Sequence, residues 1–370
     1  MKVMTVFGTR PEAIKMAPLV KKLEEAAGIE SVLCVTAQHR EMLDQVLELF
    51  ELKPDYDLNI MKPNQTISMI TSNVIIGLEE VLKKEMPDIV LVHGDTTTTF
   101  ATALACFYQQ IKVGHVEAGL RTYDKYSPYP EEMNRVLTGH IADYHFAPTK
   151  NNLNNLLKEG IKQENVFVTG NTVIDALLQV AGKPYEFQEE TLKSLDFENR
   201  RVVTVTCHRR ENLGENMANI FGAIRSIALE FSDVEIVYPM HMNPKVRETA
   251  NRVLQGMERV HLIEPLQYQP FVNLMAKSYL IVTDSGGMQE EAPSLGKPVL
   301  VVRKETERPE AVEAGTVKLA GVEQQTIYEM AKELLSNEDS YNKMAFATNP
   351  YGDGRACERI VEILKEKIKS

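Results

Sequence analysis

The sequence predicts an α/β protein with two doubly wound, Rossmann-like domains, each built on a parallel sheet covered by helices. The chain has 370 residues, more than one domain usually holds, and 44% of them are apolar, which is enough for two ordinary cores. Short apolar runs recur along the chain, and longer segments of helical period separate them. Runs that are apolar on both faces indicate strands of parallel sheets with helices on either side.

The apolar runs are the predicted strands, and they fall into two similar halves of the chain. They span residues 2–7, 31–36, 89–93, 113–117, 166–169, 201–206, 235–239, 260–263, 280–283 and 298–302. Residues 182–200 are polar and show no clean period, as a domain boundary does. We expect domains at 1–171 and 172–354, with an amphipathic helix over 355–370 that could pack back on the first domain.

Composition excludes several classes of function. A formal charge of −11 opposes binding to nucleic acid or to an acidic membrane surface, because a polyanion would first meet repulsion. No segment is long and apolar enough for a signal-peptide core or a membrane span, so we expect a soluble cytoplasmic protein. The four cysteines lie far apart without a Cys-x-x-Cys pair, which indicates buried free thiols.

The loops exclude common cofactors. A dinucleotide fingerprint needs Gly-x-Gly-x-x-Gly after the first strand, but Arg10 stands two positions after Gly8, in the path of a pyrophosphate. The pair Gly296-Lys297 has Glu291 where a P-loop needs its first glycine. The sequence also lacks metal-ligand spacings. We therefore expect no nicotinamide cofactor, no P-loop ATPase and no metal site.

Polar residues gather directly after the predicted strands, where ligands of open parallel sheets bind. Ser285 to Gly287 lie between a strand and a helix, so their amides could hold a diphosphate, and Glu291 in that helix could accept ribose hydroxyls. An ordinary helix cap with solvated glutamates is the alternative. Arg10, Lys15 and Arg308 follow other strands and could contact phosphate, or could be surface cations.

Four residues are candidate proton carriers. Asp95 follows a strand, and its simplest role is to cap the next helix. Glu117 ends an apolar strand, where a carboxylate needs a partner, and an ion pair with Arg121 is the structural alternative. Glu131 lies in a predicted first helical turn, which favours any acid. His208 ends the first strand of the second half, a position that favours phosphate contact or proton transfer.

Six motifs occur in order along the chain. They are GTRPEAIK at 8–15, VHGDT at 92–96, HVEAGLR at 115–121, PEEMNR at 130–135, CHRREN at 207–212 and DSGGMQEEA at 284–292. Together they resemble the bacterial non-hydrolysing UDP-N-acetylglucosamine 2-epimerases. The resemblance implies two Rossmann-type domains facing a cleft (a GT-B-like fold) and reversible conversion of UDP-N-acetylglucosamine to UDP-N-acetylmannosamine. It also implies a homodimer and no added cofactor.

The resemblance implies roles for single residues as well. Asp95, Glu117 and Glu131 match the family's acid/base carboxylates, and His208 matches its essential histidine. The residues that match nucleotide-sugar contacts are Arg10, Lys15, Phe271, Ser285, Gly286, Gly287, Glu291 and Arg308. A second, activating substrate site near the cleft would involve Gln38, His39 and Gln65. The sequence departs from the family pattern at Leu266, where some members carry a glutamine.

The chemistry implied by the resemblance suits these residue types. The C2 proton of the sugar has no carbonyl beside it, so we expect the C1–O bond to UDP to break first and a glycal to form. Inversion then needs proton carriers on both faces of the sugar, and groups already in place must stabilise the charge on UDP. The product would supply cell-surface polysaccharide precursors. A hydrolysing epimerase and a GT-B glycosyltransferase are the alternative functions, and a nucleotide-sugar sensor would have no use for four acid/base groups.

Overall fold

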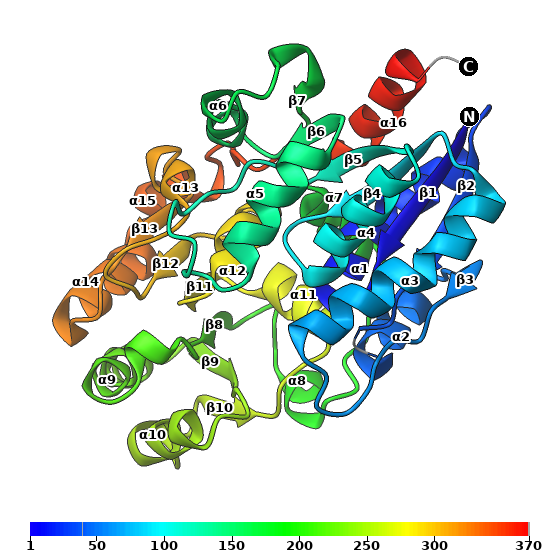
Figure 1. The fold of residues 1–370 in the computed structure, drawn as a ribbon. Helices are drawn as coiled ribbons and strands as arrows, with labels where there is room; N and C mark the ends of the chain where they lie inside the picture. The colour runs from blue at the N-terminus through cyan, green and yellow to red at the C-terminus, as the bar shows by residue number, and fades with distance from the viewer. Residues whose placement is uncertain (39, 369–370) are drawn as a thin grey trace. The chain divides into compact units, whose positions relative to one another are not determined.

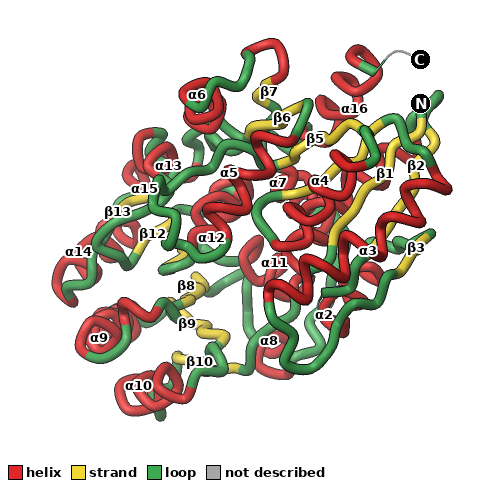
Figure 2. The backbone as a smooth tube through the Cα atoms, in the orientation of Figure 1, coloured by secondary structure: helices red, strands yellow, loops and turns green. Residues whose placement is uncertain are grey.

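The structure is a computed structural model that describes residues 1–38 and 40–368 (Figure 1). The chain divides into two compact units. The first unit comprises Met1–Ala176 and the return segment that starts at Tyr351, and the second comprises Leu177–Pro350. Each unit is a parallel sheet with flanking helices, so the predicted class of two Rossmann-like α/β domains is confirmed (Figure 2).

The first unit holds a seven-stranded parallel sheet in the order β3-β2-β1-β4-β5-β6-β7. Its strands are β1 (Lys2–Phe7), β2 (Glu30–Val35), β3 (Tyr56–Asp57), β4 (Ile89–His93), β5 (Lys112–Val116), β6 (Tyr144–Ala147) and β7 (Val166–Val168). Its helices are α1 (Arg10–Glu25), α2 (Arg40–Leu49), α3 (Ile67–Glu85), α4 (Thr97–Tyr108), α5 (Glu131–Ile141), α6 (Lys150–Lys158) and α16 (Ala356–Lys367). Helix α7 (Thr172–Ala181) carries the chain into the second unit.

The second unit holds a six-stranded parallel sheet in the order β10-β9-β8-β11-β12-β13. Its strands are β8 (Arg201–Thr206), β9 (Val234–Pro239), β10 (Val260–Ile263), β11 (Leu280–Thr283), β12 (Val299–Val301) and β13 (Val317–Leu319). Its helices are α8 (Glu190–Ser194), α9 (Glu215–Glu230), α10 (Pro244–Leu254), α11 (Tyr268–Lys277), α12 (Gly286–Glu291), α13 (Pro309–Glu313), α14 (Gln324–Ser336) and α15 (Glu338–Ala345).

Both sheets reverse their strand order beside the first strand of the unit. In the first unit β1 lies between β2 and β4, and in the second unit β8 lies between β9 and β11. Such a reversal is the switch point at which doubly wound folds bind ligands, beyond the carboxyl ends of the strands. The loops after β1, β4, β8 and β11 are therefore the segments that the fold places for function.

Apolar strands and capped helices explain why these segments fold as they do. Four of the six β1 side chains are apolar and fully buried, as expected of a strand with helices on both faces. Thr96 caps α4, because its hydroxyl accepts a hydrogen bond from the Thr99 amide at 3.1 Å. Helix α16 returns to the first unit and packs on α1, and the partly buried Asp175 carboxylate accepts the amide of Cys357 at 2.9 Å.

Three further features bear on function. All four cysteines are free and buried, as the sequence indicated. Among the helices that the structure describes, none is both long and apolar enough to cross a bilayer. Within the same residues, no cluster of three or more histidine, cysteine, aspartate or glutamate side chains is arranged to hold a metal ion.

Candidate active site

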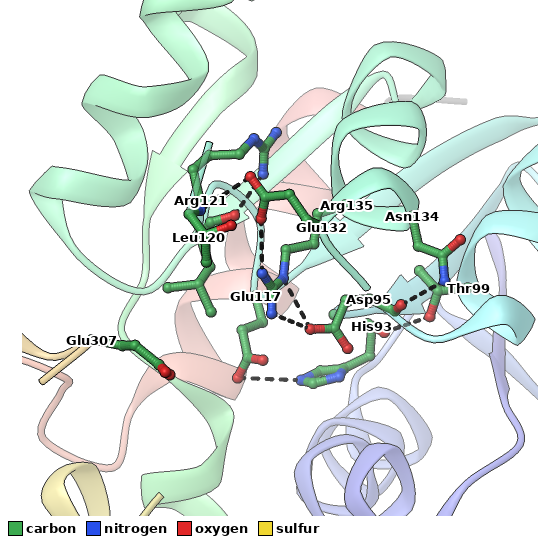
Figure 3. A network of polar contacts seen from close by, with 12 residues as sticks. His93, Asp95, Thr99, Glu117, Leu120, Arg121, Glu132, Asn134, Arg135 and Glu307 are labelled. Atoms are coloured by element: carbon green, nitrogen blue, oxygen red, sulfur yellow. Dashed lines mark hydrogen bonds and ion pairs between the residues drawn. The ribbon is translucent and has the colours of Figure 1, made fainter. Parts of the chain in front are cut away.

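Two of the predicted proton carriers follow neighbouring strands of the first sheet. Asp95 lies just after β4 and Glu117 just after β5, and these strands pair in parallel register. Their carboxylates therefore reach the same edge of the sheet (Figure 3). Glu131 begins α5, the helix that follows β5 in the chain, and its side chain is partly exposed.

The Glu117 carboxylate is held by a cation and an amide. Its side chain is only 14% exposed, and Lys15 forms an ion pair with its Oε2 atom. The Asn171 side-chain amide donates to the same oxygen at 2.9 Å. Glu117 itself has φ +60°, the left-handed region in which a non-glycine residue is uncommon. The sequence-based alternative of an ion pair with Arg121 is wrong.

Arg121 instead pairs with Glu159, whose Oε1 lies 2.7 Å from its Nε atom, and Arg121 also donates to the carbonyl of Leu120 at 2.8 Å. Its side chain is fully buried. The guanidinium therefore anchors the loop after β5 to helix α6, and Glu117 forms its ion pair with Lys15 instead. Sequence proximity suggested the wrong cation, because a turn at 117–119 separates the two side chains.

His93, which the sequence analysis did not select, faces Glu117. Its Nε2 atom lies 3.7 Å from the Glu117 Oε2 atom (Figure 3). Burial lowers the pKa of His93 to about 4, so the ring is neutral at pH 7. The sequence did not indicate this contact with Glu117, because a buried histidine at the end of an apolar strand is usually structural.

Asp95 does not cap α4, because Thr96 does. Arg135 holds the Asp95 carboxylate instead, with its Nε and Nη2 atoms 2.9 and 2.6 Å from Asp95 Oδ2 (Figure 3). The same guanidinium donates to Glu132 Oε2 at 3.0 Å. One buried arginine on α5 thus bridges the candidate Asp95 to a second carboxylate that the sequence analysis passed over.

Glu12 is a further buried carboxylate that the sequence analysis missed. It accepts hydrogen bonds from the amides of Gly8 and Thr9 at 3.0 and 2.8 Å, and from the Thr99 hydroxyl at 3.0 Å. It therefore ties the loop after β1 to the start of α4. Burial raises the pKa of Glu12, while these hydrogen bonds oppose the rise. Arg10 begins the helix beside it with a partly exposed side chain.

A cavity of about 280 Å³ opens at the carboxyl ends of β8, β9 and β11 in the second unit. Four of the predicted site residues line it, namely His208, Phe271, Ser285 and Glu291. Leu266 lines it as well, so the position that departs from the family pattern contributes an apolar wall. An apolar cavity with a few convergent polar groups is typical of a small-molecule site.

His208 lies against a carboxylate and a second imidazole. Its Nδ1 atom is 3.5 Å from Asp284 Oδ1, and its ring stacks on His241 with centroids 5.3 Å apart. Burial lowers the pKa of His208, and the Asp284 carboxylate acts in the opposite direction. Asp284 itself is completely buried. The sequence analysis did not select it as a site residue.

Glycines and arginines converge at the start of α12. A Cβ atom on Gly286 would lie 3.7 Å from Arg209 Nη2 and 3.9 Å from Arg308 Nη2, so both guanidinium groups approach this glycine. A Cβ atom on Gly287 would lie 3.3 Å from Glu291 Oε1. Arg308 also forms an ion pair with the buried Glu290. Two guanidinium groups thus stand beside backbone amides with room between them, as an anion site requires, and Glu290 balances the charge of one of them.

The residues predicted for a second substrate site lie apart in the chain. Gln38 follows β2, and its Oε1 atom accepts a hydrogen bond from the Thr98 hydroxyl at 3.0 Å. Gln65 precedes α3, and its buried side-chain oxygen has no hydrogen-bond partner among the described residues. His39 lies outside the described residues.

Comparison with known proteins places the chain in one family. The family model for UDP-N-acetylglucosamine 2-epimerase matches residues 21–365. The UDP-N-acetylglucosamine 2-epimerase of Bacillus subtilis is 61% identical over 364 residues, which cover 98% of this chain and 95% of that protein.

Solved structures of relatives support the same family assignment. The UDP-N-acetylglucosamine 2-epimerase of Neisseria meningitidis bound to UDP-N-acetylglucosamine is 55% identical, with a TM-score of 0.86 over 99% of this chain and 100% of that one. MnaA of S. aureus, solved with UDP, is also 55% identical, with a TM-score of 0.86 over 98% of this chain and 96% of that one. This chain therefore belongs to the UDP-N-acetylglucosamine 2-epimerase family and is an enzyme of the isomerase class.

Proposed function

We propose that the enzyme interconverts UDP-N-acetylglucosamine and UDP-N-acetylmannosamine by eliminating UDP and adding it back. The observation that carries the proposal is the edge of the first sheet, where Asp95 and Glu117 present two carboxylates, each already paired with its own cation. Each cation holds its carboxylate in a fixed position, as a proton carrier requires. The 55% identical Neisseria enzyme bound to UDP-N-acetylglucosamine supports the choice of substrate.

The elimination step balances without a cofactor. The C1–O bond breaks and its electron pair stays on the diphosphate oxygen, while one carboxylate takes the C2 proton and a C1=C2 double bond forms. The products are a glycal and UDP. In the return step a carboxylic acid delivers a proton to the other face of C2, and the UDP oxygen attacks C1. No net oxidation occurs, and we propose Asp95, Glu117 and Glu131 as the proton carriers.

The nucleotide part of the substrate would bind to the second unit. Phe271 offers an apolar ring, Ser285 to Gly287 offer backbone amides, and Glu291 offers a carboxylate to the ribose. Arg308 and His208 would stabilise the charge that develops on UDP. Arg10 and Lys15 remain proposed sugar or phosphate contacts, and the Lys15 ammonium already neutralises the Glu117 carboxylate.

We further propose a homodimer, activation by a second substrate molecule near Gln38, His39 and Gln65, and a role in supplying cell-surface polysaccharide precursors. Apolar side chains that a partner copy could cover include Ile76 on α3 and Phe107 and Tyr108 at the end of α4, each more than 60% exposed. Static light scattering would measure the assembly directly, and charged substitutions at Phe107 and Tyr108 would be expected to dissociate a dimer formed there.

Incubation with UDP-N-acetylglucosamine alone tests the proposed reaction. We expect proton NMR to show UDP-N-acetylmannosamine approaching a constant ratio to the substrate, from either direction. Stoichiometric release of free N-acetylmannosamine with UDP would instead identify a hydrolysing epimerase. Absence of turnover until an acceptor sugar is added would identify a glycosyltransferase.

A further inference from the structure

We propose that Asp284 is a positioning residue for His208, which fixes the Nδ1–H of the ring and stabilises the imidazolium whose Nε2–H faces the departing diphosphate. The proposal deepens the proposed function, because it assigns to His208 the charge on the leaving UDP. It concerns a fully buried carboxylate that does not itself reach the substrate.

The Asp284 carboxylate is fixed by donors from a neighbouring loop. It follows β11, the strand that pairs with β8, and it accepts the amides of His208 and Arg209 at 2.9 and 2.8 Å. The Asn212 side-chain amide donates to the same oxygen at 3.0 Å and also to the carbonyl of Val302 at 3.1 Å. The other carboxylate oxygen, Oδ1, lies 3.5 Å from His208 Nδ1.

The geometry sets the orientation of the His208 ring. The carboxylate stands at Nδ1, and His241 stacks on the ring at an interplanar angle of 12°. Nε2 lies on the opposite side of an imidazole from Cβ, so it is the nitrogen available to the cavity that His208 lines. Ser285, and not Asp284, is the residue at the N-cap of α12, so capping does not account for the buried aspartate.

The charges around His208 make Asp284 the group that favours a protonated ring. Burial, His241 and Arg209 each lower the pKa of His208, and the Asp284 carboxylate raises it. Glu291 lines the same cavity and is the other carboxylate there. Nearby Tyr238 donates its hydroxyl to the carbonyl of Cys207 at 2.7 Å and stays neutral, because burial raises its pKa. Without a nearby carboxylate to oppose the effect of burial, a buried histidine would be deprotonated at neutral pH.

The step that this arrangement serves is the departure of UDP. As the C1–O bond breaks, its electron pair moves to the diphosphate oxygen, and His208 Nε2–H donates to that oxygen. Nδ1–H remains directed at Asp284 throughout, so the carboxylate accepts no proton. Re-addition of UDP to C1 reverses the step. A histidine oriented by a buried carboxylate in this way also serves in hydrolase triads, where replacing the carboxylate by an amide favours the wrong tautomer.

The test is Asp284→Asn, measured across pH. We expect kcat to fall about 100-fold at pH 7 and above, with KM changed less than about threefold, and we expect this loss to shrink as pH falls below the ordinary imidazole pKa of 6.5. The loss grows with pH because the variant's His208 gives up its proton at a lower pH. Asp233→Asn is the matched control, since Asp233 pairs with Arg201 away from the cavity. It should stay within about twofold of the parent at each pH.

Two further measurements distinguish a positioning role of Asp284 from a role in protein stability alone. In the His208→Ala background, Asp284→Asn should cost no further activity, because it acts through the histidine. Two outcomes would overturn the proposal: a double variant whose kcat is clearly lower than that of His208→Ala alone, or an Asp284→Asn loss of the same size at every pH.

The second measurement is an NMR titration of His208 in the ligand-free parent, which needs no folded variant. It should show the Nδ1–H tautomer of the neutral ring, and an Nε2–H tautomer would also overturn the proposal. If the parent failed to epimerise UDP-N-acetylglucosamine, the proposed function would fall while the titration still decided the pairing.

Discussion

At the scale of single residues, Glu131 and Glu132 show how adjacent carboxylates take different roles. Glu132 is buried, pairs with Arg135 and accepts the amides of Thr122 and Tyr123 at 3.0 and 2.9 Å. Glu131 is partly exposed at the start of the same helix. The buried neighbour therefore holds the loop, while the exposed one stays the proposed proton carrier.

Glu132→Gln and Glu131→Gln form a matched pair that checks this division. Glu132→Gln should lower the free energy of unfolding by about 2–4 kcal/mol, because it leaves a buried guanidinium with less compensation. Glu131→Gln should change that free energy by less than about 0.5 kcal/mol and should lower kcat about 100-fold or more. Urea unfolding and steady-state kinetics on both variants measure the two effects. The reverse pattern would make Glu132 the proton carrier.

Residue identities at the strand ends could be predicted from sequence, but their partners could not. The motifs located Asp95, Glu117 and His208 correctly after β4, β5 and β8. Their partners Arg135 and Asn171 lie about 40 and 54 positions away in the chain, so no local pattern connects them. Only the folded sheet brings such residues into contact. Without it, capping rules gave the wrong role for Asp95, and sequence proximity gave the wrong cation for Glu117.

At the scale of elements, each unit closes the loop after its first strand with an internal carboxylate. Glu12 accepts the amides of Gly8 and Thr9 after β1, and Asp284 accepts those of His208 and Arg209 after β8. Dinucleotide-binding folds use the amides at this position for phosphate. These amides are already satisfied here, which gives a second physical reason, beside Arg10, to expect no nicotinamide cofactor.

Three neighbouring strands of the first unit each bury a neutral histidine, and this predicts acid sensitivity. Burial lowers the pKa of His93, His115 and His145 to about 4, 3 and 4. In the unfolded chain these histidines have the ordinary pKa of 6.5, so below that pH they bind protons that the folded unit does not bind. The free energy of unfolding therefore decreases as pH falls from about 6.5 towards 4. Each histidine contributes a slope of about 1.4 kcal/mol per pH unit in that range.

Unfolding of the parent and of His145→Gln across pH 7 to 4 measures this slope. The parent should lose stability steeply, and the variant should show a slope smaller by about 1.4 kcal/mol per pH unit. An unchanged slope in the variant would mean that His145 is protonated in the folded protein.

The strands that the sequence analysis did not predict are short or interrupted. β3 has two residues and β13 has three, and both lie at sheet edges, where a few backbone hydrogen bonds suffice. β6 is internal, but its segment Tyr144–Ala147 mixes two aromatic rings with His145. Tertiary pairing with β5 and β7 makes this a strand, and a single-sequence pattern does not contain that information.

At the scale of the whole molecule, the two units share one topology but present different chemistry. Both have the strand order third, second, first, fourth, fifth, sixth, and the first unit adds β7. The first unit carries the paired carboxylates Asp95 and Glu117, and the second carries the cavity with His208 and Glu291. The proposed reaction needs both sets, since one handles protons and the other handles the diphosphate.

The central claim is that the bond between C1 and UDP breaks and forms again, and oxygen-18 in that bridge tests it most directly. In heavy water, the epimerised product should carry deuterium at C2, because one carboxylate abstracts the proton and another delivers it. Over the same period, NMR of the β-phosphate should show oxygen-18 moving from the bridge to non-bridging positions while UDP is free in the site. Exchange at C2 with the label fully retained in the bridge would contradict the elimination mechanism.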